Sequence, residues 1–368
     1  MTETVLKGGR LITGEPFEVA YENGKLTAVG TEINPVNKTV IDITGQYLSP
    51  GWIDDHVHCF SEMHLYYDYP DEIGVQKGVT TVIDAGTTGA ENIGRFHQLA
   101  LQAKTNVLAL VNISKWGIVE QDELADLSKI KQALVTKVLH EYPDFIVGIK
   151  ARMSKTVIGS NGITPLKLAK EIQKTNQNLP LMVHIGSEPP KLTEILDVME
   201  PGDVMTHCFN GKPNGILDRE TDEIKAFAKV AYEHGIIFDT GHGTDSFNFH
   251  VAEVAFAKGI KANSISTDIY IRNRKNGPVY DLATTMEKLH VVGYTWPEII
   301  EKVTTAPANN FHLTTKGKLV VGADADITVF DFEDGAKTLT DSNGFTRTTN
   351  VQIKPHYAII GGACYDVL

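Results

Sequence analysis

The chain alternates between short apolar runs and stretches compatible with helices, and this alternation constrains the fold more than any other feature. Near-continuous β-branched runs fit strands that are buried on both faces. Strand–helix alternation favours a parallel sheet, and eight such units match the roughly 250 residues of a (β/α)8 TIM barrel. A doubly wound open sheet is the alternative, but it does not explain the count of eight. The runs are 52–58, 80–86, 107–114, 145–153, 179–186, 203–209, 236–240 and 264–269.

The two ends of the chain have a different pattern. Both consist of short strand-like segments separated by glycine turns, such as Asn23–Gly24, which is a strong hairpin signal. Each end is too short for a separate domain, and chain ends often lie close together. We therefore predict one composite β-sandwich domain from residues 1–52 and 309–368, beside a barrel of residues 53–308.

Charge and composition exclude several classes of partner. Asp and Glu number 46 against 34 Lys and Arg, a net charge of −12. This balance argues against binding to nucleic acid or to an anionic membrane surface. Three cysteines are not a disulfide framework, and no apolar run approaches the roughly 18 residues that span a bilayer. Because the N-terminus lacks the pattern of a secretion signal, we expect a cytoplasmic protein.

Two histidines end the first run of the predicted barrel. His56 and His58 are two positions apart, so on a strand both point to the same face. Two imidazoles at one strand end form half of a zinc site. The alternative is a pair of unrelated histidines, one of them bound to Asp54 or Asp55.

A lysine lies inside the fourth run. A buried, unpaired charge is costly, so Lys150 requires an explanation. One explanation is a buried ion pair, which the residue taken alone favours. The other is a neutral amine that reacts with carbon dioxide, giving a carbamate able to bridge two metal ions.

Three more polar residues follow apolar runs, where active sites of barrel enzymes lie. His184 and His207 end the fifth and sixth runs, and Asp268 ends the eighth, where it could instead cap a helix. Together with the residues above they predict a centre for two divalent metal ions about 3.5–4 Å apart. In this prediction one ion is held by His56, His58 and Asp268, the other by His184 and His207, with carboxylated Lys150 between them.

Several segments resemble the amidohydrolase superfamily of binuclear metallohydrolases, over essentially the whole chain. They are PGWIDDHVH at 50–58, GVTTVIDAG at 78–86, GIKAR at 148–152, STDI at 266–269 and GADADITVFD at 322–331. The resemblance implies that the subtype with a carboxylated lysine is complete in its six ligands: His56, His58, Lys150, His184, His207 and Asp268. It also implies two metal ions, with zinc as the default, and a homo-oligomer.

A narrower branch of the superfamily is similar at HVHC (56–59), HIGSEPP (184–190), HCFNG (207–211), DTGHG (239–243) and GPVYDLATTMEKL (277–289). Members of this branch are often labelled dihydroorotase or adenine deaminase. The resemblance implies a deacetylase that cleaves O-acyl esters of α-hydroxy carboxylates, such as acetyl-mandelate. A cyclic amidase like dihydroorotase or hydantoinase, an adenine-type deaminase and a non-catalytic assembly protein are the alternatives. The last would be expected to lack metal ligands.

The expected mechanism is attack of a metal-bridging hydroxide on the carbonyl, with Asp268 moving the proton to the leaving group. Arg152 lies on the same strand face as Lys150, and a guanidinium suits a substrate carboxylate. Its alternative role is charge balance for the carbamate or a nearby acid. Asn210 and His242 are further candidates for substrate binding, and each could equally be part of the loop structure.

Overall fold

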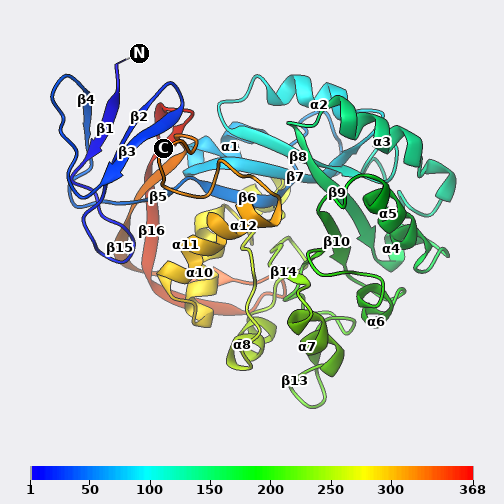
Figure 1. The fold of residues 1–368 in the computed structure, drawn as a ribbon. Helices are drawn as coiled ribbons and strands as arrows, with labels where there is room; N and C mark the ends of the chain where they lie inside the picture. The colour runs from blue at the N-terminus through cyan, green and yellow to red at the C-terminus, as the bar shows by residue number, and fades with distance from the viewer. Residues whose placement is uncertain (1, 368) are drawn as a thin grey trace.

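The computed structural model describes residues 2–367 and contains a curled sheet of seven parallel strands. The strands run in chain order around the sheet, so each predicted unit lies beside the next (Figure 1). This arrangement confirms the barrel prediction. The strands are β6 (Trp52–Val57), β7 (Val79–Gly89), β8 (Asn106–Asn112), β9 (Ile146–Met153), β10 (Leu181–Ile185), β11 (Val204–Thr206) and β14 (Ile237–Asp239).

The eighth run, 264–269, is not a regular strand, which corrects one detail of the prediction. It still closes the barrel, because Ser264 bridges to Asp239 of β14 and Ile269 bridges to Val57 of β6. A positive φ of 49° at Asp268 interrupts the extended backbone that a regular ladder requires. The Asp268 amide donates to the His56 carbonyl at 2.7 Å, so the closure places Asp268 beside the first histidine.

Helices cover the outside of the barrel (Figure 1). In α5, the buried residues Leu166, Ala169 and Ile172 recur every third residue, which is the spacing of one helical face. Within residues 2–367 we find no helix long and apolar enough to cross a membrane. The helices are α1 (Pro70–Ile73), η1 (Val75–Lys77), α2 (Ile93–Ala100), η2 (Leu127–Lys129), α3 (Gln132–Glu141), α4 (Lys155–Ile158), α5 (Thr164–Thr175), α6 (Leu192–Leu196), α7 (Ala226–Glu233), α8 (Phe249–Ala257), α9 (Ile271–Asn276), α10 (Leu282–Val292), α11 (Trp296–Lys302) and α12 (Thr305–Asn310), with a small hairpin of β12 (Leu217–Asp218) and β13 (Glu223–Ile224).

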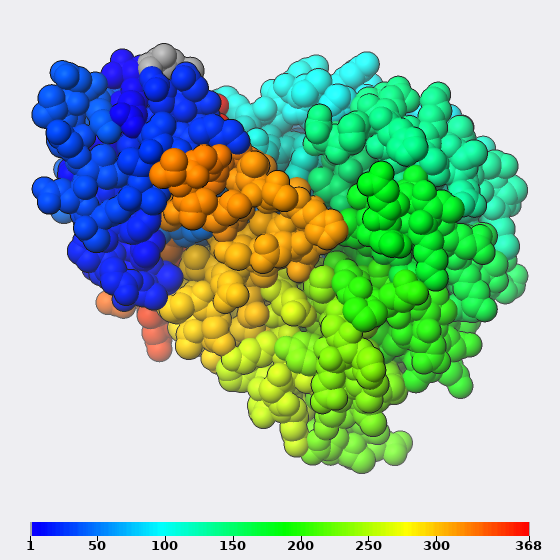
Figure 2. Space-filling view, in the orientation of Figure 1, coloured from blue at the N-terminus to red at the C-terminus, as the bar shows by residue number. Residues whose placement is uncertain are grey.

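Two four-stranded sheets from the chain ends form a lobe beside the barrel (Figure 2). Their orders are β3-β2-β1-β4 and β17-β16-β15-β5, and both sheets contribute to one core that includes Leu26, Leu48 and Ile327. Because β5 pairs with β15, the sheets fit a composite domain, while its limits at residues 52 and 309 stay a prediction. The strands are β1 (Thr4–Lys7), β2 (Glu18–Glu22), β3 (Lys25–Gly30), β4 (Thr39–Asp42), β5 (Tyr47–Pro50), β15 (Ile327–Thr340), β16 (Thr346–Ile360) and β17 (Ala363–Asp366).

The hairpin of β15 and β16 extends beyond the lobe and reaches the barrel. At its tip, Ser342 Oγ donates to the Gly243 carbonyl at 3.0 Å, and an Asp341 oxygen accepts from the Phe249 amide at 3.0 Å. The tip therefore packs against the loop that follows β14, one of the loops that surround the site described next.

Candidate active site

The carboxyl ends of the barrel strands surround a cavity of about 320 Å³. The structure brings all six predicted metal ligands to its wall, and Arg152 also lines it. The ligands come from separate strand ends, which is where barrel enzymes build their sites. They are His56 in β6, His58 directly after β6, Lys150 in β9, His184 in β10, His207 after β11, and Asp268 in the closing segment.

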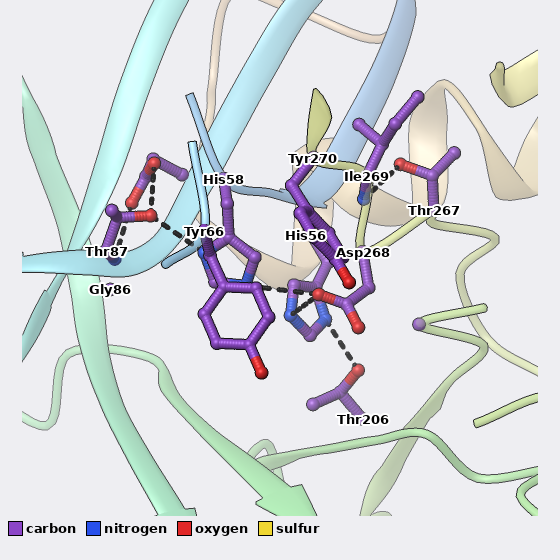
Figure 3. A network of polar contacts seen from close by, with 12 residues as sticks. His56, His58, Tyr66, Gly86, Thr87, Thr206, Thr267, Asp268, Ile269 and Tyr270 are labelled. Atoms are coloured by element: carbon purple, nitrogen blue, oxygen red, sulfur yellow. Dashed lines mark hydrogen bonds and ion pairs between the residues drawn. The ribbon is translucent and has the colours of Figure 1, made fainter. Parts of the chain in front are cut away.

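Hydroxyl groups orient the first two histidines (Figure 3). Thr206 donates its proton to Asp239 at 2.7 Å, so its oxygen accepts from His56 Nδ1 at 2.8 Å. In the same way, Thr87 donates to Asp84 at 2.8 Å, and its oxygen lies 2.7 Å from His58 Nδ1. Both rings therefore present the lone pair of Nε2 to the cavity. Such outer-shell partners are typical of metal-binding histidines.

Burial also favours the neutral form of the other two histidines. His207 Nδ1 donates to the Gly241 carbonyl at 2.6 Å, which leaves its Nε2 free of a proton. Nδ1 of His184 is buried and has no hydrogen-bond partner within residues 2–367. Burial lowers the pKa of His207 to about 4 and that of His184 well below its ordinary value. Neutral imidazoles are the form that binds metals.

Asp268 faces the two histidines of β6. Its Oδ1 lies 3.1 Å from His58 Nε2 and 3.5 Å from His56 Nε2. With the tautomers above, these are acceptors facing an acceptor, so a proton or a metal ion must lie between them. Burial raises the pKa of Asp268. The contact with His58 and the neighbouring positive charge outweigh this effect, so the pKa lies below its ordinary value. Ligand atoms of His56, His207 and Asp268 all lie within 4.8 Å of one another.

Lys150 lies at the bottom of the cavity, almost completely buried. Its Nζ is 3.2 Å from His56 Nε2 and 3.0 Å from Met182 Sδ. Burial lowers the pKa of this ammonium to about 7, so a large fraction of the amine is neutral near physiological pH. Gly86 makes room for the side chain, because a Cβ there would lie 2.6 Å from the Cβ of Lys150.

These donors fit the two metal ions expected from the sequence. Oriented imidazoles and a carboxylate form an N/O donor set that suits zinc and other divalent ions. The facing acceptors of His58 and Asp268 require a positive partner between them, and the buried His184 Nδ1 has no hydrogen-bond partner within residues 2–367. His207 and Asp268 also adopt positive φ angles of 70° and 49°, a strained backbone of the kind that collects at functional sites.

Arg152 lines the cavity but is engaged by other side chains. Its Nη1 donates to both oxygens of Glu123 at 3.1 Å, and Nη2 donates to Gln121 at 3.2 Å. Glu123 is fully buried, and burial raises the pKa of its carboxyl to about 7. The arginine thus has the charge-balancing contact anticipated as its alternative role, while its position at the wall still permits substrate contact.

The structure does not bring Asn210 and His242 to the wall of this cavity. Asn210 shapes a turn: its Nδ2 donates to the His207 carbonyl at 2.8 Å, and its Oδ1 accepts from the Lys212 amide at 3.0 Å. His242 lies behind the wall, where its Nε2 is 2.8 Å from Nζ of Lys288. Both contacts match the loop-structure alternative for these residues, because each side chain serves the fold around the site.

Further residues complete the wall of the cavity. Tyr66, whose ring centre is 5.6 Å from that of His58, packs edge-on against Tyr270 (Figure 3). Gln121 and Lys212 also line the cavity. All four follow strand ends and lie in connecting segments. The position of Tyr270 directly after the eighth run indicates a place at the mouth, and the cavity includes it. For Tyr66, Gln121 and Lys212, the loop conformation that brings them to the wall could not be deduced from the sequence.

Comparison with known proteins places this site in a family. The chain is 68% identical to a deacetylase of Enterococcus faecalis over 99% of both chains. It is 39% identical to a deacetylase of Brucella anthropi, over 92% of this chain and 85% of the relative. The chain belongs to the deacetylase family of the amidohydrolase superfamily. In agreement, residues 319–366 match a family model described as a deacetylase-like composite domain.

Solved structures of the family carry different names. A crystal structure of an adenine deaminase superposes with a TM-score of 0.98 at 67% identity, covering 100% of both chains. A crystal structure of a dihydroorotase gives a TM-score of 0.91 at 35% identity, covering 100% of this chain and 98% of that chain. By contrast, an adenine deaminase of Moorella thermoacetica is 36% identical over only 23% of this chain and 14% of its own. Membership in this family confirms an enzyme fold of the amidohydrolase type. The names of the relatives and of the solved structures, however, disagree about which bond is cleaved.

Proposed function

We propose that this protein is a metal-dependent deacetylase that hydrolyses O-acyl esters of α-hydroxy carboxylates, with acetyl-mandelate as the model substrate. The observation that carries the hydrolytic part is the set of oriented histidine lone pairs facing Asp268 and Lys150. Two relatives that match nearly the full chain are named deacetylases, which supports acyl transfer to water over the other reactions.

Two divalent ions, when bound, supply an activated water near neutral pH and a Lewis acid for the carbonyl. Of the chain's own residues, His56, His58 and Asp268 would hold one ion, and His184 and His207 the other. Lys150 would bridge them as a carbamate, since burial keeps its amine reactive. We propose zinc as the native metal only because imidazole nitrogens and carboxylate oxygens are donors that suit it.

Asp268 has the proton-transfer role. Its carboxylate lies at the cavity wall within contact of His58, and its lowered pKa keeps it ionised and able to accept a proton. It would take the proton of the attacking water and return it to the leaving alkoxide. Arg152 is the proposed contact for the substrate carboxylate, with Glu123 holding its guanidinium in place.

Adenine deamination is the second candidate, because the solved structure at 67% identity carries that name. Cyclic amide hydrolysis follows from the dihydroorotase structure. The leaving group separates the three: an alcohol, ammonia or a ring nitrogen.

The test is turnover of both enantiomers of O-acetyl-mandelate, dihydroorotate and adenine by zinc-loaded protein, with products followed by NMR. We expect acetate from one enantiomer. Ammonia from adenine or ring opening of dihydroorotate, without acetate, would overturn the proposed substrate and leave the metal site standing.

The same assay tests Asp268. The Asp268→Asn variant should keep both metal ions and lose turnover by about 10²–10⁴-fold, the usual contribution of a general acid–base group. Near-normal turnover in a metal-replete variant would contradict this role.

A further inference from the structure

The loop after β11 places a second cation at the cavity. The turn fixed by Asn210 ends at Lys212, whose side chain lines the same wall as Arg152 and the histidines. Because Lys212 and the candidate metal ligands line one cavity of about 320 Å³, its ammonium faces the space in which a substrate would bind.

Lys212 and Arg152 differ in how firmly they are paired. Arg152 is bound by Glu123, a side chain with 0% exposure. Lys212 Nζ lies 2.8 Å from Asp245, and this carboxylate is 73% exposed. Water solvates an exposed pair well, so separating it costs little, whereas separating the Arg152 pair would leave a buried charge uncompensated.

We propose that Lys212 is a specificity-determining residue: the substrate carboxylate replaces Asp245 on its ammonium when the ester binds. Asp245 then acts as an internal competitor that neutralises Lys212 in the free enzyme. This inference rests on the proposed function and adds to it, because it names Lys212, beside Arg152, as a second contact for the substrate carboxylate and as the one that must exchange its partner. A charge-assisted hydrogen bond of this kind favours a carboxylate over its neutral amide.

The test compares O-acetyl-mandelate with its primary carboxamide, an ester of similar size without the charge. For Lys212→Met, the KM of the carboxylate should rise about tenfold or more, as expected for loss of a hydrogen bond between charged groups. The KM of the carboxamide should change much less, and Lys212→Arg should restore part of the preference. Asp245→Asn should lower the KM of the carboxylate, because the competitor has lost its charge.

Lys258→Met is the matched control. Lys258 pairs with Glu223 at 2.6 Å, and both are exposed, but the pair does not line this cavity. Its loss should leave the ratio of the two KM values unchanged. Equal shifts for carboxylate and carboxamide in Lys212→Met, or no shift, would overturn the inference while acetate release still supported the proposed function.

A direct binding measurement distinguishes failure of the proposed reaction from failure of the inference about Lys212. Mandelate, the product expected from the ester, should bind the zinc-loaded wild type in calorimetry and bind Lys212→Met about tenfold or more weakly. If wild type releases no acetate but shows this difference, the proposed reaction is wrong and the recognition by Lys212 stands. If wild type does not bind mandelate, both proposals are contradicted.

Discussion

Two buried lysine–histidine pairs occupy this barrel, and they differ in only one essential respect. Lys150 lies 3.2 Å from His56 Nε2, and Lys288 lies 2.8 Å from His242 Nε2. Both lysines are almost completely buried, and burial lowers the pKa of each to about 7. Only Lys150 borders the cavity. Lys288, which is part of α10, instead donates to the Pro278 carbonyl at 2.7 Å.

The comparison shows that a lowered pKa does not by itself make a lysine functional. Burial has the same effect on both amines, because desolvation disfavours the charged form wherever it occurs. To form a carbamate, the lysine must also be accessible to carbon dioxide, and it must lie beside groups that can share a metal ion with the carbamate. Asp268 and the histidines line the same cavity as Lys150, whereas Lys288 does not border that cavity.

The largest expected difference between the pairs is in metal binding. Lys150→Met should lose metal and turnover by more than the roughly 10–100-fold that changes in outer-shell groups cause. Lys288→Met should keep its metal content. Labelled bicarbonate should give one carbamate signal by carbon NMR in wild type and in Lys288→Met, and none in Lys150→Met. A carbamate at Lys288, or full metal content in Lys150→Met, would remove the distinction.

A smaller effect on metal affinity is expected from removing the hydroxyl group that orients His56. Thr206 orients His56, and Asp239 would keep its bonds from Ser264 and Ser266 if the hydroxyl were removed. Thr206→Val should therefore weaken metal affinity by about 10–100-fold with little change in fold. Competition with a chelator measures this affinity, with circular dichroism as the control. Unchanged affinity would show that the barrel alone sets the ring orientation.

The last expected effect concerns the fold and not the metal site: it is a pH dependence of the free energy of unfolding at Lys288. Between about pH 7, where the folded protein releases this proton, and pH 10.5, the ordinary value for lysine, the unfolded chain binds more protons. Stability therefore rises with pH in this window, by at most about 1.4 kcal/mol per pH unit, and is level below it. Denaturant unfolding of wild type and Lys288→Met from pH 6.5 to 9.5 should show this rise in their difference. A difference that does not change with pH would mean that Lys288 stays charged when folded.

The pattern of the chain predicted most of the fold. Seven of the eight apolar runs became parallel strands in the expected order. Strands that are buried on both faces consist of near-continuous apolar residues, and such runs are visible in the local sequence. The eighth departs where Asp268 takes a positive φ, which depends on its contacts and not on its neighbours in sequence.

The six candidate ligands were also visible from the sequence, because parallel strands bring their carboxyl ends to one face of a barrel. Most of the other residues that line the cavity were not visible in this way. Asn210 and His242 were expected at the wall, yet one shapes a turn and the other is enclosed with Lys288. Lys212 lies where the Asn210 turn directs it, and Arg152 is held by Glu123 from a separate segment.

The sequence by itself therefore determined the strand order, the composite β lobe and the identity of the candidate metal ligands, all of which follow from periodicity and strand-end position. The tertiary structure alone decided which nitrogen of His56, His58 and His207 faces the cavity, and which cation at its wall has an exchangeable partner. These properties depend on groups brought together from distant segments, whose hydrogen bonds and solvent exposure no local pattern encodes.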